Sequence, residues 1–318
     1  MDLSINQNIF PIRSSAEMED YEAFKLQQKV LWVTEELRFS GDTESYRSLS
    51  QKERKLIDMI LGFFAVGDAI VIENLDKRFT FDVDTITGKM FLSVQKYIEF
   101  IHAETYGKWI EVLIPQERRD EIFRMAASHN SVNLKAEWAN KWIVSDHERS
   151  VRFFAFACVE GIFFSTLFAI IFWFSSRGKM TEFAASNKFI SRDEAIHRDQ
   201  GCRWFMRYRN SNVPDHIIYE IVKDAIFIED KFIDEILIED ISDMTKDNLK
   251  MYSRLTADNL LRQCNIEPLY MASNPFPFMD MVSIKSKGNF HEIVITDYSG
   301  VKNGETSEGF ANPSETNF

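Results

Sequence analysis

Two glutamate–histidine pairs in the sequence share one spacing, Glu99-x-x-His102 and Glu194-x-x-His197. Residues three positions apart lie on the same face of a helix, so each pair can offer a carboxylate and an imidazole to one metal ion. None of the other four histidines has an acidic residue three positions before it. A single pair would more often be a solvated face or a core histidine, but two pairs favour metal binding.

Two more acids, Asp68 and Glu160, interrupt stripes of apolar residues at helical spacing. The stripes contain Ile57, Leu61, Phe64 and Ile72 around Asp68, and Phe153, Ala157, Phe164 and Ile171 around Glu160. Unpaired carboxylates are very costly to bury, whereas two divalent ions would neutralise four of them. Carboxylate oxygens with a few imidazoles suit iron or manganese, because structural zinc sites favour thiolates.

The order of these groups repeats, since a single acid is followed by a Glu-x-x-His pair in each half of the sequence. Ferritin-like bundles with two metal ions have this arrangement, in which four helices each bring a carboxylate inward and two of them add a histidine. Glycine (12) and proline (7) are scarce, which favours long helices. We therefore predict an all-α protein with a ferritin-like four-helix di-iron core inside a larger helical bundle.

We expect one helical domain, residues 1–285, followed by a flexible tail, residues 286–318. Ser50 and Glu53 have the spacing of a capping box, which marks the start of a helix. Helices are predicted over residues 18–37, 50–78, 87–113, two stretches within 117–145, 147–176, 181–209, 214–240 and 246–264. The polar tail cannot bury enough apolar surface to order itself, yet it ends in Phe318, which suits a docking peptide.

The composition narrows the classes of protein that fit. A net charge of −12 argues against a general nucleic-acid binder, which needs a basic face. Three cysteines without a CxxC motif, and a first segment without signal-peptide character, predict a reduced, cytoplasmic location. The apolar stretch 153–174 is long enough to span a bilayer, but Glu160 near its middle would cost about 2.5–3.5 kcal/mol there. We predict a buried core helix and no membrane association.

Four stretches that contain these acids resemble the small subunit of ribonucleotide reductase, and the resemblance covers nearly the whole chain. They are LGFFAVGDAIVIENLDKRF, YIEFIHAETYGKWI, VEGIFFS and ISRDEAIH, and the late stretch NPFPFM is similar to eukaryotic and viral members. The resemblance implies two iron ions per chain, or manganese instead, with the ligands Asp68, Glu99, His102, Glu160, Glu194 and His197. This chain departs from the family at Gly67, where a serine is common, and in lacking an N-terminal extension.

The resemblance also implies that Tyr106, one helical turn beyond His102, holds a radical. Further roles follow from it: an apolar lining around the radical from Phe164, Phe168 and Ile190, and radical transfer through Trp32, Asp193 and Tyr298. Without the resemblance, Tyr106 and Trp32 would be taken as ordinary core residues. A radical survives only where water and reductants are excluded, so we expect Tyr106 to be buried.

The implied activity is that of ribonucleoside-diphosphate reductase, an oxidoreductase. The small subunit would use oxygen at its di-iron site to form the tyrosyl radical and would pass it to a large subunit, which reduces ribonucleotides to deoxyribonucleotides. The resemblance implies a homodimer that docks on the large subunit through the tail, with Phe318 as anchor, in the cytoplasm or, for a virus, the host cytoplasm. A di-iron oxidase or oxygenase would share the six ligands but would not need Trp32, Asp193 or the tail. A ferritin-like iron-storage protein would have a shorter chain and shell-forming surfaces, and would not need Tyr106 in an apolar pocket.

Overall fold

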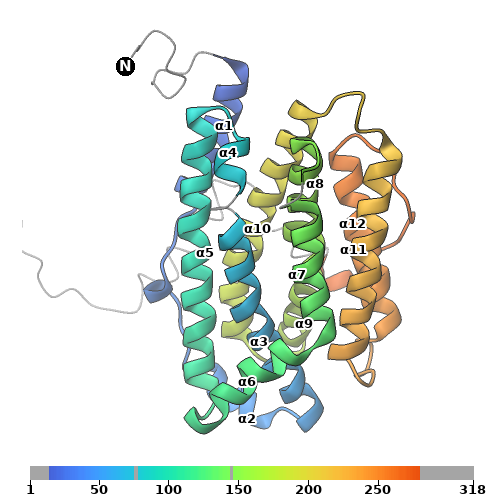
Figure 1. The fold of residues 1–318 in the computed structure, drawn as a ribbon. Helices are drawn as coiled ribbons and strands as arrows, with labels where there is room; N and C mark the ends of the chain where they lie inside the picture. The colour runs from blue at the N-terminus through green and yellow to red at the C-terminus, as the bar shows by residue number, and fades with distance from the viewer. Residues whose placement is uncertain (1–13, 75–77, 144–145, 280–318) are drawn as a thin grey trace, which may run out of the picture. The chain divides into compact units, whose positions relative to one another are not determined.

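The computed structural model describes residues 14–74, 78–143 and 146–279, all of which fall in one compact unit (Figure 1). The side chains of residues 65, 66, 68–71, 73 and 74 lie outside the described set. The described residues form helices and irregular segments, with no strand beyond an isolated antiparallel bridge between Ile241 and Met244. The predicted all-α fold is confirmed, whereas the expected boundary at residues 285 and 286 lies outside the described residues.

Four helical segments carry the acids singled out in the sequence. They are α3 (Gln51–Asn74), α5 (Ile86–Leu113), α10 (Thr181–Tyr208) and a run of α8 (Arg149–Cys158), η3 (Val159–Phe163) and α9 (Ser165–Ser176). Helix α5 packs against α3, helix α10 packs against α8 and α9, and α5 and α10 also touch. Their inward faces together form the expected four-helix core.

The remaining helices pack against the helices of this core (Figure 1). They are α1 (Ser15–Lys29), η1 (Thr34–Glu36), α2 (Asp42–Ser48), α4 (Thr80–Asp82), α6 (Gln116–Ser128), α7 (Asn130–Ile143), α11 (Asp215–Ile236) and α12 (Lys246–Gln263). Helix α1 packs along α5, α6 crosses α3, and α11 contacts both α7 and α12. These outer layers keep water from the faces that carry the acids.

The predicted capping box is present at the start of α3. The backbone N–H of Ser50 donates to Glu53 Oε2 at 2.9 Å, and the N–H of Glu53 donates to Ser50 Oγ at 3.3 Å. Each side chain satisfies an N–H group that the first turn of a helix leaves without a partner.

The first predicted helix is shorter than expected, because it ends at Lys29 rather than near residue 37. Tertiary hydrogen bonds hold the segment after it out of the helix. Arg192 donates to the carbonyl oxygen of Val30 at 2.7 Å, and Thr34 Oγ1 donates to Glu104 at 2.9 Å. Helical periodicity continued past this point in the sequence, but contacts from α10 and α5 outweighed it.

Helix α2 was not predicted from the sequence. Its first residue, Asp42, contacts the start of α10. The buried carboxylate of Asp42 accepts a hydrogen bond from the backbone N–H of Phe183 at 2.7 Å, in the first turn of α10. Met180, which precedes α10, makes no side-chain cap of its own. An acid distant in the sequence therefore caps α10, and burial raises its pKa above the usual range despite that bond.

The apolar run from Arg149 to Ser176 is long and apolar enough to cross a membrane, but 89% of its apolar window is buried within the unit. This burial agrees with the predicted core helix. The helix is not regular, however, because η3 in its middle is π-helical and holds Glu160. A π-helical segment accommodates one extra residue, often at a functional site.

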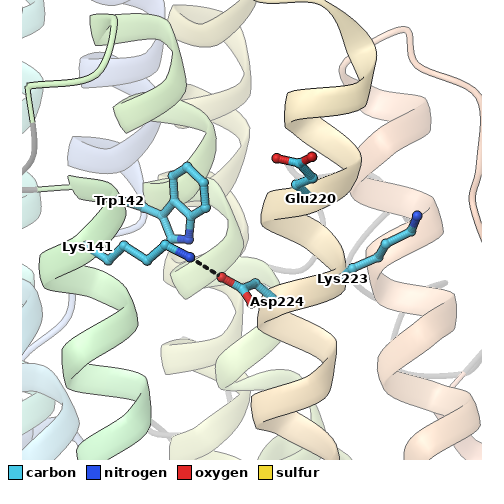
Figure 2. Close-up of a pocket in the computed structure, with 5 residues that line it drawn as sticks. All are labelled: Lys141, Trp142, Glu220, Lys223 and Asp224. Carbon is cyan, nitrogen blue, oxygen red and sulfur yellow. Dashed lines mark hydrogen bonds and ion pairs between the residues drawn. The ribbon is translucent and has the colours of Figure 1, made fainter.

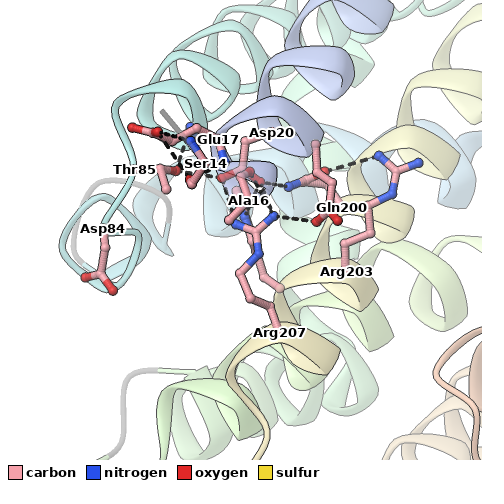
Figure 3. A network of polar contacts seen from close by, with 12 residues as sticks. Ser14, Ala16, Glu17, Asp20, Asp84, Thr85, Gln200, Arg203 and Arg207 are labelled. Atoms are coloured by element: carbon pink, nitrogen blue, oxygen red, sulfur yellow. Dashed lines mark hydrogen bonds and ion pairs between the residues drawn. The ribbon is translucent and has the colours of Figure 1, made fainter. Parts of the chain in front are cut away.

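A single buried carboxylate joins α1 to α5 and α10 (Figure 3). Asp20 on α1 is fully buried and accepts hydrogen bonds from Gln200 at 2.8 Å, Trp204 at 3.0 Å and Arg207 at 2.8 and 2.9 Å. It also accepts from Thr85, the residue that caps α5, at 2.6 Å. Asp20 thus links three helices at one end of the core.

We expect Asp20→Ala to lower the free energy of unfolding by about 3–5 kcal/mol, because Arg207 would keep its charge without its main partner. The control is Asp84→Ala nearby, whose ion pair with Arg149 at 2.6 Å is half exposed and should contribute only about 0–1 kcal/mol. Urea unfolding followed by circular dichroism measures both. Equal shifts in the two midpoints would contradict this role for Asp20.

Candidate metal centre

Five of the six predicted ligands meet in the interior, where α5, η3 and α10 face one another. Ligand atoms of Glu99, Glu160, Glu194 and His197 all lie within 4.8 Å of one another, and all four residues are buried. His102 Nδ1 lies 3.1 Å from Glu194 Oε1 and 3.3 Å from Glu99 Oε2. The two Glu-x-x-His pairs therefore face each other across one centre.

The sixth predicted ligand, Asp68, belongs to α3, but its side chain lies outside the described residues. Helix α3 packs directly against α5, which carries Glu99 and His102. Its membership of the centre stays a prediction.

Burial and the crowding of carboxylates shift the protonation of this centre. Burial alone would lower the pKa of His197, but the carboxylates of Glu99 and Glu194 outweigh it and raise that pKa to about 9. Burial would raise the pKa of Glu194, but hydrogen bonds from His102 and His197 bring it well below its usual range. The raised pKa of His197 and the lowered pKa of Glu194 have one cause, which is the attraction between the carboxylates and positive charge beside them.

Several polar atoms here make no hydrogen bond of good geometry among the described residues, namely Nε2 of His197 and both carboxylate oxygens of Glu99, which lie 3.0 and 3.3 Å from imidazole nitrogens of His197 and His102. Buried polar atoms are nearly always satisfied, so such a concentration needs an explanation. A metal ion supplies one, because it accepts lone pairs from oxygen and nitrogen alike. The donor set of carboxylates and imidazoles fits iron or manganese, since the described part of the centre contains no thiolate.

One neighbour of the centre was not assigned a role from the sequence. Gln95 is buried one turn before Glu99 on α5, and its Nε2 donates to Glu160 Oε1 at 3.2 Å. This bond ties the acid of η3 to the helix that carries Glu99. The sequence did offer a signal, because Gln95 lies on the same helical face as Glu99 and His102.

Asp193 connects the centre to the segment that follows α1. Its Oδ2 accepts from Trp32 Nε1 at 2.7 Å and lies 3.4 Å from His102 Nε2, and its Oδ1 accepts from Gln27 at 3.1 Å. The rings of Trp32 and His102 are 6.0 Å apart and nearly parallel. With Nε2 of His102 turned to Asp193, its Nδ1 faces the carboxylates, which is how a carboxylate orients a metal-binding histidine.

Tyr106 is fully buried among aromatic rings. Phe64 stacks on it with ring centroids 4.3 Å apart and an angle of 4° between the planes. Phe164 and Phe168 also pack against Phe64, with ring centroids 5.7 and 5.5 Å from that of Phe64. Phe64 was seen in the sequence only as part of an apolar stripe, although it lies one turn before Asp68.

The Tyr106 hydroxyl donates to Asn187 Oδ1 at 2.8 Å, and the Asn187 amide donates to the carbonyl oxygen of Phe183 at 2.8 Å. Asn187 is buried on α10, and Ile190 is buried one turn further on. Asn187 was missed in the sequence, where its only signal is its place two turns before Glu194.

Tyr298 and Phe318, the two predicted residues of the tail, lie outside the described residues.

A surface pocket lies elsewhere in the described part of the protein, between α7 and α11 (Figure 2). It measures about 400 Å³ and is lined by Lys141, Trp142, Glu220, Lys223 and Asp224. Lys141 and Asp224 form an ion pair at 2.6 Å across it. None of the metal-centre residues contributes to this pocket, so the candidate chemistry belongs to the buried centre.

Comparison with known proteins agrees with this geometry. The family model for the ribonucleotide reductase small chain matches residues 7–275. The small chain of ribonucleoside-diphosphate reductase from Nicotiana tabacum is 36% identical over 91% of this protein and 87% of its own length, and subunit M2 from Danio rerio is 36% identical over 95% and 78%. The structure of the Rnr4 homodimer from Saccharomyces cerevisiae has a TM-score of 0.77 at 26% identity, covering 92% of this protein and 89% of that one.

These matches extend over the helices that build the centre as well as those around them. The related solved structures are ribonucleotide reductase proteins with the same helical fold. Buried glutamates and histidines on α5, η3 and α10, and a sequence match over most of the length, therefore lead to one conclusion. The protein belongs to the family of ribonucleotide reductase small chains and is a small subunit of the oxidoreductase ribonucleoside-diphosphate reductase.

Proposed function

We propose that this small subunit binds two iron ions and forms a stable radical on Tyr106, which it passes to the large subunit. The observation that carries the proposal is the buried cluster of three glutamates and two histidines, whose charge calls for cations. With Asp68 as the fourth carboxylate, two divalent ions would give a neutral centre. Manganese is the alternative metal, because it accepts the same oxygen and nitrogen donors.

The bound ions would supply the oxidising power for the tyrosine by reducing dioxygen. The protein's own residues would hold the centre and control what reaches it. Glu99, His102, Glu160, Glu194 and His197, together with Asp68, would be the ligands. Gln95 would orient Glu160 through its 3.2 Å bond, and Asp193 would orient His102 from the opposite side.

Tyr106 would be the residue that loses an electron and its hydroxyl proton to become a neutral radical. Its stack on Phe64, and the rings of Phe164 and Phe168 that contact Phe64, would exclude water and reductants. Asn187 fixes the direction of the hydroxyl group in the resting tyrosine. This environment suits a radical that must persist until a substrate is available elsewhere.

Radical transfer would run from the centre through His102, Asp193 and Trp32. Contacts of 3.4 Å between His102 and Asp193 and 2.7 Å between Asp193 and Trp32 link these three residues in one chain of polar contacts. Tyr298 in the tail would continue the route to the large subunit, where ribonucleotides are reduced to deoxyribonucleotides. We propose that residues 286–318 form the docking tail, with Phe318 as its anchor.

We also propose a homodimer in the cytoplasm. A homodimer is supported by the Rnr4 homodimer among related structures. It would cover the apolar side chains that α5 exposes, Tyr97 and Phe100, which are 49% and 52% exposed here. The cytoplasmic location is supported by three cysteines that are all free thiols.

Elemental analysis tests the metal proposal. After reconstitution we expect about two irons per chain, in line with four carboxylates and two histidines at a di-metal site. Glu99→Ala and Glu194→Ala should each lower this content sharply, whereas Glu111→Ala, an exposed acid on the same helix α5, should leave it unchanged. Metal content that is the same in all three variants would argue against this centre.

Electron spin resonance tests the role of Tyr106. Tyr106→Phe should retain the iron absorption and lose both the radical signal and reductase activity, because phenylalanine keeps the packing but has no hydroxyl group to oxidise. The control is Tyr97→Phe, which changes an exposed tyrosine on the same helix. A radical that survives in Tyr106→Phe would assign the signal to another residue.

Truncation tests the tail. Removing residues 313–318, or changing Phe318 to Ala, should leave iron and radical content unchanged, because no proposed ligand lies there. It should weaken binding to the large subunit and lower nucleotide reduction, and a peptide ending in SETNF should compete with the intact protein. Reductase activity with the matching large subunit is the measurement. Full activity after truncation would mean that another surface docks.

A further inference from the structure

A buried ion pair lies outside the metal centre and takes no part in the proposed chemistry. Lys135 on α7 and Glu229 on α11 are almost completely buried, with 2.7 Å between Nζ and Oε2. Burial lowers the pKa of Lys135 and raises that of Glu229, so both charged forms are disfavoured by their surroundings. Replacing such a pair by apolar residues is often neutral or stabilising, so stability alone does not explain it.

The ammonium group of Lys135 has a second partner, the carbonyl oxygen of Phe163 at 3.1 Å. Phe163 is the last residue of η3, the π-helical segment that carries Glu160. The preceding carbonyl, that of Ile162, accepts a hydrogen bond from Ser165 Oγ at 2.8 Å. Two consecutive carbonyls at the end of η3 are thus held by side chains.

Glu229 fixes the other side of the same junction. It accepts a hydrogen bond from the hydroxyl group of Thr166, which is the second residue of α9. Lys135 therefore holds the end of η3 while Glu229 holds the start of α9, and their mutual contact joins the two. Helices α7 and α11 together clamp the point where the π-helical segment returns to a regular α-helix.

Packing beside this point is incomplete. A cavity of about 30 Å³ is bordered by Val159 and Phe163 of η3, by Phe164 and by Lys135. Side chains that line a cavity lose contacts on that side, so apolar packing constrains η3 less there. The aromatic rings of Phe232, Phe63 and Phe163 lie 3.6, 4.5 and 5.0 Å from the Lys135 ammonium and hold that group in place.

We propose that Lys135 and Glu229 are positioning residues that hold η3 in its π-helical form and so direct Glu160 at the metal. A π-helical segment accommodates one residue more than the same length of regular α-helix, in which each residue turns by roughly 100°. If η3 changed to a regular α-helix, Glu160 would therefore rotate away from Glu99 and Glu194. The inference rests on the proposed metal-binding function.

The experiment compares two double variants on the same pair of helices. Lys135→Met with Glu229→Gln removes the buried pair and the bond to Phe163 while keeping side-chain size and an acceptor for Thr166. Lys141→Met with Asp224→Asn removes an exposed pair of 2.6 Å that also joins α7 to α11 (Figure 2). The control variant separates loss of a helix–helix ion pair in general from loss of the clamp on η3.

Hydrogen exchange in metal-free protein gives the first readout. We expect faster exchange of the amides of residues 159–164 in the buried double variant and no change there in the control variant. Cobalt(II) binding gives the second, with weaker binding and an altered visible spectrum in the buried variant only. Lys135→Arg, which keeps a charged donor, should retain the spectrum of the unaltered protein.

Unchanged exchange at residues 159–164 together with an unchanged cobalt spectrum would overturn the proposal. If the buried double variant does not fold, Thr166→Val takes its place, because it removes only the hydroxyl bond to Glu229, and the same two changes are expected in smaller measure. Failure of the unaltered protein to bind cobalt would count against the proposed function itself. Hydrogen exchange would then still decide whether the clamp holds η3.

Discussion

The burial of carboxylates at the centre of the helical bundle is the constraint on which this structure depends. Glu99, Glu160 and Glu194 lie within a few ångströms of one another, away from water, where their negative charges repel. His102 and His197 face these carboxylates, which raise the pKa of both imidazoles although burial opposes it. A cation is the partner that these side chains could bind, and apolar side chains enclose the cluster on the surrounding helices.

Single buried polar side chains repeatedly join segments that are distant in sequence. Asp193 on α10 binds Trp32 and Gln27 near the N-terminal end and faces His102 on α5. Asp20 on α1 does the same for α5 and α10 at another level of the core. Because each of these carboxylates accepts several hydrogen bonds, its burial is tolerated and the helices that it joins are held in register.

The irregular parts of the helices coincide with residues for which we propose a chemical role. Glu160 lies in a π-helical segment, and Trp32 lies in the extended stretch after α1 rather than on a helix. In both places, hydrogen bonds from other elements hold a backbone that its own sequence would not select. Local irregularity of this kind lets a side chain point where a regular helix would not send it.

The sequence by itself determined the fold class, most helix boundaries and which side chains face inward. Those properties follow from the spacing of apolar residues, from caps such as Ser50 and Glu53, and from the Glu-x-x-His pairs, all of which act within a few turns of one helix. Burial of Tyr106 followed in the same way from its place one turn beyond His102.

Only the tertiary structure decided the partners that come from other elements. The sequence indicates these partners weakly or not at all. They include Asn187 beside Tyr106, Phe64 stacked on the Tyr106 ring, Gln95 bonded to Glu160, and the Lys135–Glu229 pair next to η3. The same holds for the end of α1 at Lys29 and for the capping of α10 by Asp42. The physical reason is that these features depend on hydrogen bonds and ring contacts between segments far apart in the sequence, which helical periodicity does not encode.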